Sequence, residues 1–146
     1  MPQKRGSAHW EGGLKDGRGT VSTESGALDA KSYGFAMRFE GERGTNPEEL
    51  VAAAHASCFS MALSMVLGES DMVADSIDTR ATVTLDKVDD GFKVTKSHLD
   101  VSVRVPGADE AQVREACEKA KANCPISKLL NAEIDLEVEV AAGASA

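Results

Sequence analysis

The chain has 146 residues, of which 42% are hydrophobic and only 4% aromatic, and its formal net charge is −8. The length suits one domain, and the hydrophobic content is too high for a disordered chain. An acidic chain repels polyanions, which argues against general binding of nucleic acid or of anionic membranes. Three cysteines are an odd number and do not make a disulfide framework. In a reducing compartment, such cysteines are more often catalytic or metal-binding than structural.

The ends of the chain and its longest apolar stretch predict a cytoplasmic protein. Residues 1–5 are polar and no apolar run follows them, so we expect no targeting segment. The stretch Ala52–Leu67 contains a histidine and three serines, and we expect it to be too short and too polar to span a membrane. The low-complexity tail Ala141–Ala146 is expected to fray.

The first 40 residues predict three short strands separated by glycine-containing turns. The strands are expected at Ser7–Leu14, Arg18–Ser22 and Tyr33–Phe39. On the third strand, the residues that share a face with Arg38 are small. A charge on an exposed strand is common, so the pattern alone does not make Arg38 functional.

A strong helix-start signal follows. Asn46 can cap the helix, Pro47 suits its first turn, and Glu49 lies where a capping box needs an acid. We expect the helix to run from Pro47 to about Leu67 and to stop at Gly68. One apolar stripe consists of Leu50, Ala54, Cys58, Met61 and Met65, and Val51, Ala62 and Val66 widen it, so we expect the helix to be buried on most sides.

The rest of the chain predicts an α+β fold with antiparallel pairing. Alternating apolar residues indicate a hairpin and a final strand, and capping signals indicate two helices between them. The expected elements are strands Ser76–Val88 and Phe92–Val105, a helix from Asp109 to about Ala122, a short helix from Pro125 to Leu130, and a strand over Ile134–Val140.

The three cysteines differ in their surroundings. Cys58 lies in the middle of the long helix, where a buried cysteine is often only a small hydrophobic residue. Cys124 precedes a proline at a helix start, where unpaired N–H groups can lower a thiol pKa, although it is equally well explained as a turn residue. Cys117 falls on the inner stripe of its helix, and we interpret it as core packing.

Other kinds of site have less support in the sequence. His55 and Cys58 lie three residues apart and could chelate a metal with Cys117, Cys124 or His98, but the spacing fits no zinc pattern. His55 is better explained as a satisfied polar side chain on the helix flank. No Gly-x-Ser-x-Gly elbow and no glycine-rich phosphate loop appears.

Arg38 and Glu48 form a possible charged pair. Helix capping explains Glu48 fully without any function, because a carboxylate is favoured in the first helical turn. In the functional interpretation, the arginine stabilises a thiolate and the glutamate holds the arginine in place. A reactive thiolate at Cys58 would need such a cation, because a helix dipole fades within its first turn and Cys58 lies beyond that. The spacing does not decide between the two interpretations.

Four segments together resemble the OsmC/Ohr family, most closely its OsmC branch. They hold Asn-Pro-Glu, Cys-Phe and Cys-Pro motifs at separations that are highly specific in combination. The segments are Tyr33–Gly41, Gly44–Leu50, Ala53–Leu63 and Ala122–Ser127. The resemblance implies one OsmC-like domain over residues 1–146, with an α+β fold in which antiparallel sheets surround two central helices. It also implies an intertwined homodimer in which both subunits contribute to each site.

The same resemblance implies a thiol peroxidase that reduces organic hydroperoxides and, less well, hydrogen peroxide. Cys58 would be the peroxidatic cysteine and Cys124 the resolving one. Arg38 would stabilise the Cys58 thiolate and the peroxide, and Glu48 would orient Arg38 from across the subunit boundary. In the Ohr branch the arginine comes from the N-terminal hairpin, which makes Arg18 the alternative. No bound cofactor or metal is implied, and an external dithiol such as a dihydrolipoyl group would serve as reductant.

Two other functions remain as alternatives. A thiol-based redox sensor or binding module of the same fold would form the same disulfide without sustained turnover. A metal-binding structural dimer would use His55 and the cysteines instead.

Overall fold

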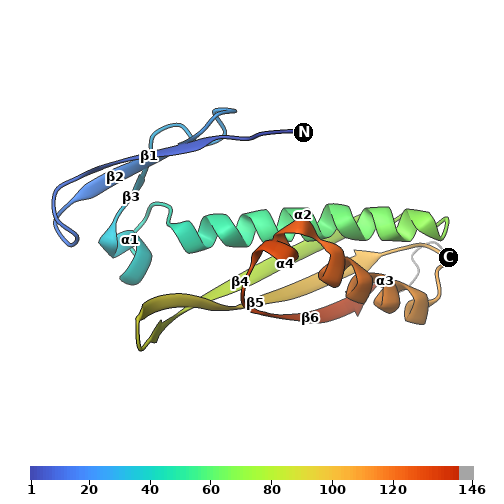
Figure 1. The fold of residues 1–146 in the computed structure, drawn as a ribbon. Coiled ribbons are helices and arrows are strands. Elements are labelled where there is room, and N and C mark those ends of the chain that lie inside the picture. The colour runs from blue at the N-terminus through green and yellow to red at the C-terminus, as the bar shows by residue number, and fades with distance from the viewer. Residues whose placement is uncertain (142–146) are drawn as a thin grey trace. The chain divides into compact units, whose positions relative to one another are not determined.

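The computed structural model describes residues 1–141. They fall into two compact units, Met1–Leu50 and a second one that begins at Val51, and each is described by itself (Figure 1). The sequence led us to expect a single domain. Residues 142–146 of the tail that was expected to fray lie outside the described residues.

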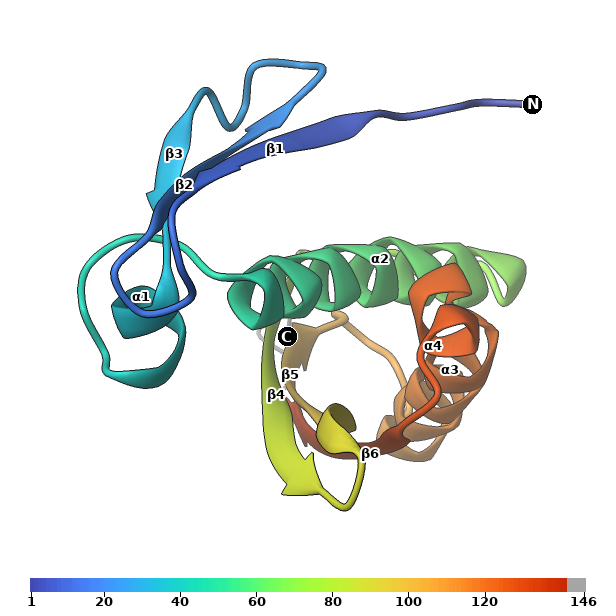
Figure 2. The same ribbon diagram turned by 60° about the vertical axis from the view of Figure 1, so that its left-hand side comes forward.

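The first unit is built on a three-stranded antiparallel meander (Figure 2). Its strands are β1 (Gly6–Glu11), β2 (Arg18–Thr23) and β3 (Lys31–Tyr33). The rings of Trp10 and Tyr33 lie 5.5 Å apart on either side of Gly19. A Cβ atom at Gly19 would come within 2.6 Å of both rings, so only glycine allows this packing.

The segment that carries Arg38 is a short helix, α1 (Phe35–Phe39), and not the strand that we predicted. The phenylalanines alternate with small residues as in a strand, but they are also four residues apart. On a helix, residues four apart are neighbours. The rings of Phe35 and Phe39 accordingly pack 4.9 Å apart on one side of α1.

The long helix α2 (Pro47–Glu69) begins as predicted. The side-chain oxygen of Asn46 accepts a hydrogen bond from the backbone N–H of Glu49, at 2.8 Å. The Glu49 carboxylate does not close the expected capping box but accepts a hydrogen bond from the Thr45 hydroxyl at 2.9 Å. At the other end, α2 continues through Gly68 to Glu69.

The second unit contains a three-stranded sheet in the order β4-β5-β6. Strands β4 (Ser76–Val88) and β5 (Gly91–Arg104) form the predicted antiparallel hairpin. Strand β6 (Glu133–Val140) pairs with β5 in parallel, from Lys96 opposite Glu133 to Val103 opposite Val140. Our expectation of antiparallel pairing is therefore wrong for this strand, because two helices lie between β5 and β6 and return the chain in the same direction.

Those two helices are α3 (Glu110–Asn123) and α4 (Pro125–Leu129). The hydrophobic core lies between the sheet, α2 and α3, which pack on the same face of the sheet (Figures 1 and 2). Its buried members are mostly aliphatic, as the low aromatic content predicts. They are Phe59, Leu63, Val66, Leu67, Leu99, Val101, Val103, Val105, Val113, Ala116, Cys117 and Ala120.

Helix α2 is not buried on most sides as we expected, and its buried side includes only Val66 of the predicted apolar residues. Buried residues on α2 are His55, Phe59, Leu63, Val66 and Leu67. On the predicted stripe, Met61 and Met65 keep 77% and 62% of their surface exposed. Because α2 is apolar on nearly all sides, the sequence pattern does not distinguish the side that contacts the core.

By length and composition alone, α2 could cross a membrane, which contradicts our expectation for this stretch. It has 23 residues, and its most apolar 18-residue window has a mean hydropathy of 1.8. The core helix of a soluble protein meets the same criteria, and Phe59, Leu63 and Leu67 on α2 are fully buried in the core.

Candidate functional site

Cys58 and Cys124 meet where α2 passes the start of α4. A hydrogen bond links their two thiols, and both cysteines are free. Cys58 is partly exposed, whereas Cys124 is fully buried. The fold therefore brings together the two cysteines that the resemblance paired, although 124 − 58 = 66 residues separate them.

The surroundings of Cys58 act on its thiol in opposite directions. Burial raises the pKa of Cys58, and the hydrogen bond to Cys124 raises it further, while the backbone N–H of Ile126 donates to its sulfur and lowers it. The net effect is a raised pKa. Within this unit, the thiol is thus held in place but not activated.

The contact with Ile126 is one that the sequence analysis missed. Ile126 follows Pro125 at the start of α4, where backbone N–H groups have no partner inside the helix. We expected those groups to act on Cys124, which precedes the proline. The signal was present in the Cys-Pro-Ile order, but only the fold places the α2 cysteine in front of it.

His55 lies one helical turn before Cys58 and is fully buried. Its Nδ1 is 2.6 Å from the Ser97 hydroxyl on β5, and its Nε2 is 2.8 Å from the Ser127 hydroxyl on α4. Burial lowers the pKa of His55, which favours the neutral ring. Both ring nitrogens are occupied, so His55 does not act as the metal ligand of the structural-dimer hypothesis. The prediction of a satisfied polar side chain is confirmed, but the position is the interior and not the flank.

Cys117 is separate from this cluster. It is fully buried in the core on α3, as predicted. Burial raises the pKa of Cys117 to about 11, so the thiol stays protonated at neutral pH. Such a thiol is a poor nucleophile.

An apolar groove of about 760 Å³ runs along the exposed side of α2. Cys58 lies in its lining together with Met61, Met65, Pro125 and Ile126. A partly exposed cysteine in such surroundings can meet a substrate that carries an alkyl or aryl group, because burial of apolar surface favours its binding.

Arg38 and Glu48 form a two-bonded ion pair within the first unit. Arg38 Nε donates to Glu48 Oε1 at 2.8 Å, and Nη2 donates to Oε2 at 2.7 Å. The hydrogen bond that Arg38 donates to Glu48 is the main cause of the raised pKa of Arg38. Both residues belong to one chain, whereas we expected the pair to form across the subunit boundary. The guanidinium is thereby held in a fixed orientation.

Arg38 also lines an apolar hollow of about 180 Å³ in the same unit. The other lining residues are Trp10, Leu14, Tyr33, Gly34, Phe35, Phe39 and Pro47. Arg18, the alternative arginine, is exposed on β2 opposite Glu11, and it is not among the residues that line the hollow. The arrangement favours Arg38 over Arg18 as an arginine that faces an apolar ligand.

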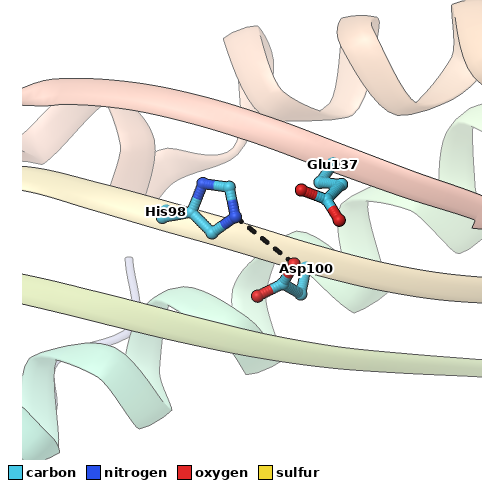
Figure 3. Close-up of side chains that lie close together, drawn as sticks. All are labelled: His98, Asp100 and Glu137. Carbon is cyan, nitrogen blue, oxygen red and sulfur yellow. Dashed lines mark hydrogen bonds and ion pairs between the residues drawn. The ribbon is translucent and has the colours of Figure 1, made fainter.

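Within residues 1–141, one group of side chains is close enough together to hold a metal ion: His98, Asp100 and Glu137 (Figure 3). Their potential ligand atoms lie within 4.8 Å of one another on the solvent-facing side of the sheet. His98 already contacts Asp135 through Nδ1 at 2.6 Å and Asp100 through Nε2 at 3.3 Å. The group includes neither His55 nor a cysteine, and the ion-pair partners of His98 are Asp100 and Asp135.

Comparison with known proteins agrees with these observations. A sequence model described as OsmC-like protein matches residues 39–139. The chain is 58% identical over 137 residues to Peroxiredoxin OsmC of Escherichia coli, covering 94% of this chain and 96% of that protein. It is 32% identical to the organic hydroperoxide resistance protein OhrB of Bacillus subtilis, covering 84% and 88% of the two chains.

The fold agrees with solved structures as well. The crystal structure of an organic hydroperoxide resistance protein OsmC from Legionella pneumophila matches with a TM-score of 0.69 and 25% identity. The match covers 97% of this chain and 98% of that one. Together, the matched residues, the identity and the shared fold show that the chain belongs to the OsmC family.

Proposed function

We propose that the protein is a thiol peroxidase that reduces organic hydroperoxides, and hydrogen peroxide less well, in defence against oxidative stress. The observation that carries this function is the contact between the thiols of Cys58 and Cys124. The names of its E. coli and B. subtilis relatives, a peroxiredoxin and an organic hydroperoxide resistance protein, support the same activity. The chemistry needs no prosthetic group, because the cysteines carry the electrons.

The reaction follows from the two thiols. The Cys58 thiolate attacks the distal peroxide oxygen, the O–O bond breaks, and the alkoxide takes up a proton and leaves as alcohol. Cys58 is then a sulfenic acid, and the Cys124 thiol condenses with it to form a disulfide and water. Two electrons have passed from the thiols to the peroxide, and an external dithiol returns them.

Arg38 is our candidate for the cation that activates Cys58. Within its own unit the Cys58 thiol has a raised pKa, so catalysis at neutral pH calls for a positive partner. Arg38 is the arginine that a carboxylate holds in a fixed orientation beside an apolar hollow. In this role Arg38 stabilises the thiolate and the negative charge on the leaving oxygen, and Glu48 orients Arg38.

The active form is proposed to be a homodimer. The groove beside Cys58 contains the exposed side chains of Met61 and Met65, and a second copy that packs along α2 would bury them. Light scattering on the purified protein should give twice the chain mass. The double variant Met61→Lys/Met65→Lys should give a monomer, and a wild-type monomer at micromolar concentration would contradict the dimer.

The location of the protein is proposed to be the cytoplasm.

The physiological reductant is proposed to be a dithiol such as a dihydrolipoyl group. A dithiol suits a disulfide with one accessible sulfur, because the second thiol of the reductant rapidly resolves the mixed disulfide that the first thiol forms. Steady-state turnover with dihydrolipoamide should exceed turnover with glutathione at equal thiol concentration. Equal rates with both would argue against a dithiol preference.

The function is tested by mass spectrometry after addition of one equivalent of cumene hydroperoxide. We expect a loss of two hydrogens and a peptide pair linking Cys58 to Cys124, with cumyl alcohol as product. In Cys124→Ser, Cys58 should remain as a sulfenic acid that dimedone traps. Free thiols and unreacted peroxide after prolonged incubation would refute the proposal, and a disulfide without turnover on added dithiol would indicate a sensor.

A further inference from the structure

His55 connects α2, the helix that carries Cys58, with strand β5 and helix α4. It lies on α2 one turn before Cys58, and its two ring nitrogens reach Ser97 on β5 and Ser127 on α4. All three side chains are buried, with His55 and Ser97 fully so and Ser127 8% exposed. A buried imidazole with one serine on each nitrogen forms a fixed bridge, because one nitrogen donates and the other accepts.

The α4 end of this bridge is the part that bears on Cys58. Helix α4 spans only Pro125–Leu129, and a helix of that length is not stable without tertiary contacts. Yet the start of α4 supplies two groups that form hydrogen bonds with the Cys58 sulfur: the Cys124 thiol and the Ile126 N–H. Ser127 is the next residue, so the hydrogen bond to His55 ties the segment to α2 beside the reacting sulfur.

From this geometry we propose that His55 is a positioning residue for the second chemical step. It holds α4 on α2 through Ser127, so that Cys124 stays in reach of Cys58 once the sulfenic acid has formed. His55 touches neither the peroxide nor a reacting sulfur. This role rests on the proposed peroxidase function, since it concerns the closure of the disulfide.

A pair of matched variants tests the role. Ser127→Ala and Ser97→Ala each remove one buried hydroxyl from His55, but only the first cuts the connection to α4. Cys58 is oxidised with one equivalent of cumene hydroperoxide, and the lifetime of its sulfenic acid is followed by rapid quenching with dimedone and mass spectrometry. Ser127→Ala should lengthen this lifetime about tenfold, the size expected for loss of one buried hydrogen bond.

Ser97→Ala should change the lifetime by no more than about twofold, although it removes an equivalent hydrogen bond. Ser127→Thr, which keeps the hydroxyl, should restore rapid closure. Equal lifetimes in Ser127→Ala and wild type would overturn the proposal, and so would an equal delay in both alanine variants, which would mean a general effect on the core. If the wild type forms no sulfenic acid at all, the result refutes the proposed peroxidase function and is distinct from a failure of the role proposed for His55.

Hydrogen exchange on the wild type gives a second test that needs no variant. The N–H groups of Lys128 and Leu130 donate to the carbonyls of Cys124 and Ile126 within α4. If α4 is tied to α2, these amides should exchange much more slowly than those in the β4–β5 turn. Exchange as fast as in that turn would overturn the proposal, even if Ser127→Ala does not fold.

Discussion

The arginine pair and the cysteine pair are assembled in opposite ways. Arg38 and Glu48 are ten residues apart, on α1 and the first turn of α2, and they meet within the first unit. Cys58 and Cys124 are brought together by long-range packing of α2, α3 and the sheet, and by the hydrogen bond between His55 on α2 and Ser127 on α4. Loss of the arginine pair should therefore affect chemistry and leave stability almost unchanged, whereas changes around the cysteines can affect both.

The largest effect is expected from Arg38→Met. Removing the charge should raise the pKa of Cys58 and slow peroxide attack about 100-fold, the size typical for loss of one group that stabilises developing negative charge. The melting temperature should remain near that of the wild type. Stopped-flow oxidation by cumene hydroperoxide measures the rate, with Arg18→Met as the matched control. If Arg18→Met gives the large loss and Arg38→Met does not, the assignment is wrong.

Glu48→Gln should have a smaller effect in the same direction. The variant keeps one oxygen that can accept a hydrogen bond from Arg38 but loses the charge and the two-bonded geometry. We expect peroxide attack to slow about tenfold, because Arg38 is still present but no longer held in one orientation. The double variant with Arg38→Met should be no slower than Arg38→Met alone. A further additive loss would mean that Glu48 acts independently of Arg38.

Cys117→Ser should show the reverse behaviour, with a loss of stability and unchanged chemistry. The substitution places a hydroxyl in a fully buried apolar position and should lower the free energy of unfolding by about 1–3 kcal/mol. Urea denaturation measures this loss. The rate of peroxide attack and the formation of the Cys58–Cys124 disulfide should match those of the wild type. Any trapping of Cys117 in a disulfide would contradict its role as core packing.

The smallest effect concerns His98 on the sheet surface. The hydrogen bond to Asp135 is the main cause of the raised pKa of His98, so the folded state binds this proton more tightly than the unfolded chain. His98 therefore adds stability below its unfolded pKa of about 6.5, and this contribution disappears as the pH rises through the folded pKa. His98→Asn should lower the melting temperature at pH 5.5 but hardly at pH 9. An equal loss at both pH values would exclude a titration effect.

Sequence reasoning predicted the elements that depend on local signals. The start of α2 followed from Asn46 and Pro47, the start of α4 from Pro125, and the β4–β5 hairpin from alternating residues. Each of these signals acts within a few residues and does not require knowledge of the partner elements. The roles of the two cysteines came from the family resemblance, and the fold then brought their thiols into contact.

The features that sequence reasoning missed depend on long-range packing. The segment around Arg38 is a helix and not the predicted strand. In so short a segment, apolar residues that recur every second position also recur every fourth position, so the pattern fits a strand and a helix equally well. The parallel pairing of β6 and the buried side of α2 depend on how the helices cross the sheet. The sequence did not predict the interior position of His55 or its partners Ser97 and Ser127, which lie 42 and 72 residues away.

The unequal exposure of the two cysteines gives the catalytic cycle a direction. In a disulfide formed between them, the sulfur of Cys124 would be buried and that of Cys58 would remain partly exposed. A thiolate can attack only the sulfur that it can reach, so in the proposed cycle we expect the reductant to form its mixed disulfide with Cys58, with Cys124 as the leaving group. In that cycle the Cys58 sulfur would receive oxygen from the peroxide and later electrons from the reductant, so the two would have to reach Cys58 by the same route, one after the other.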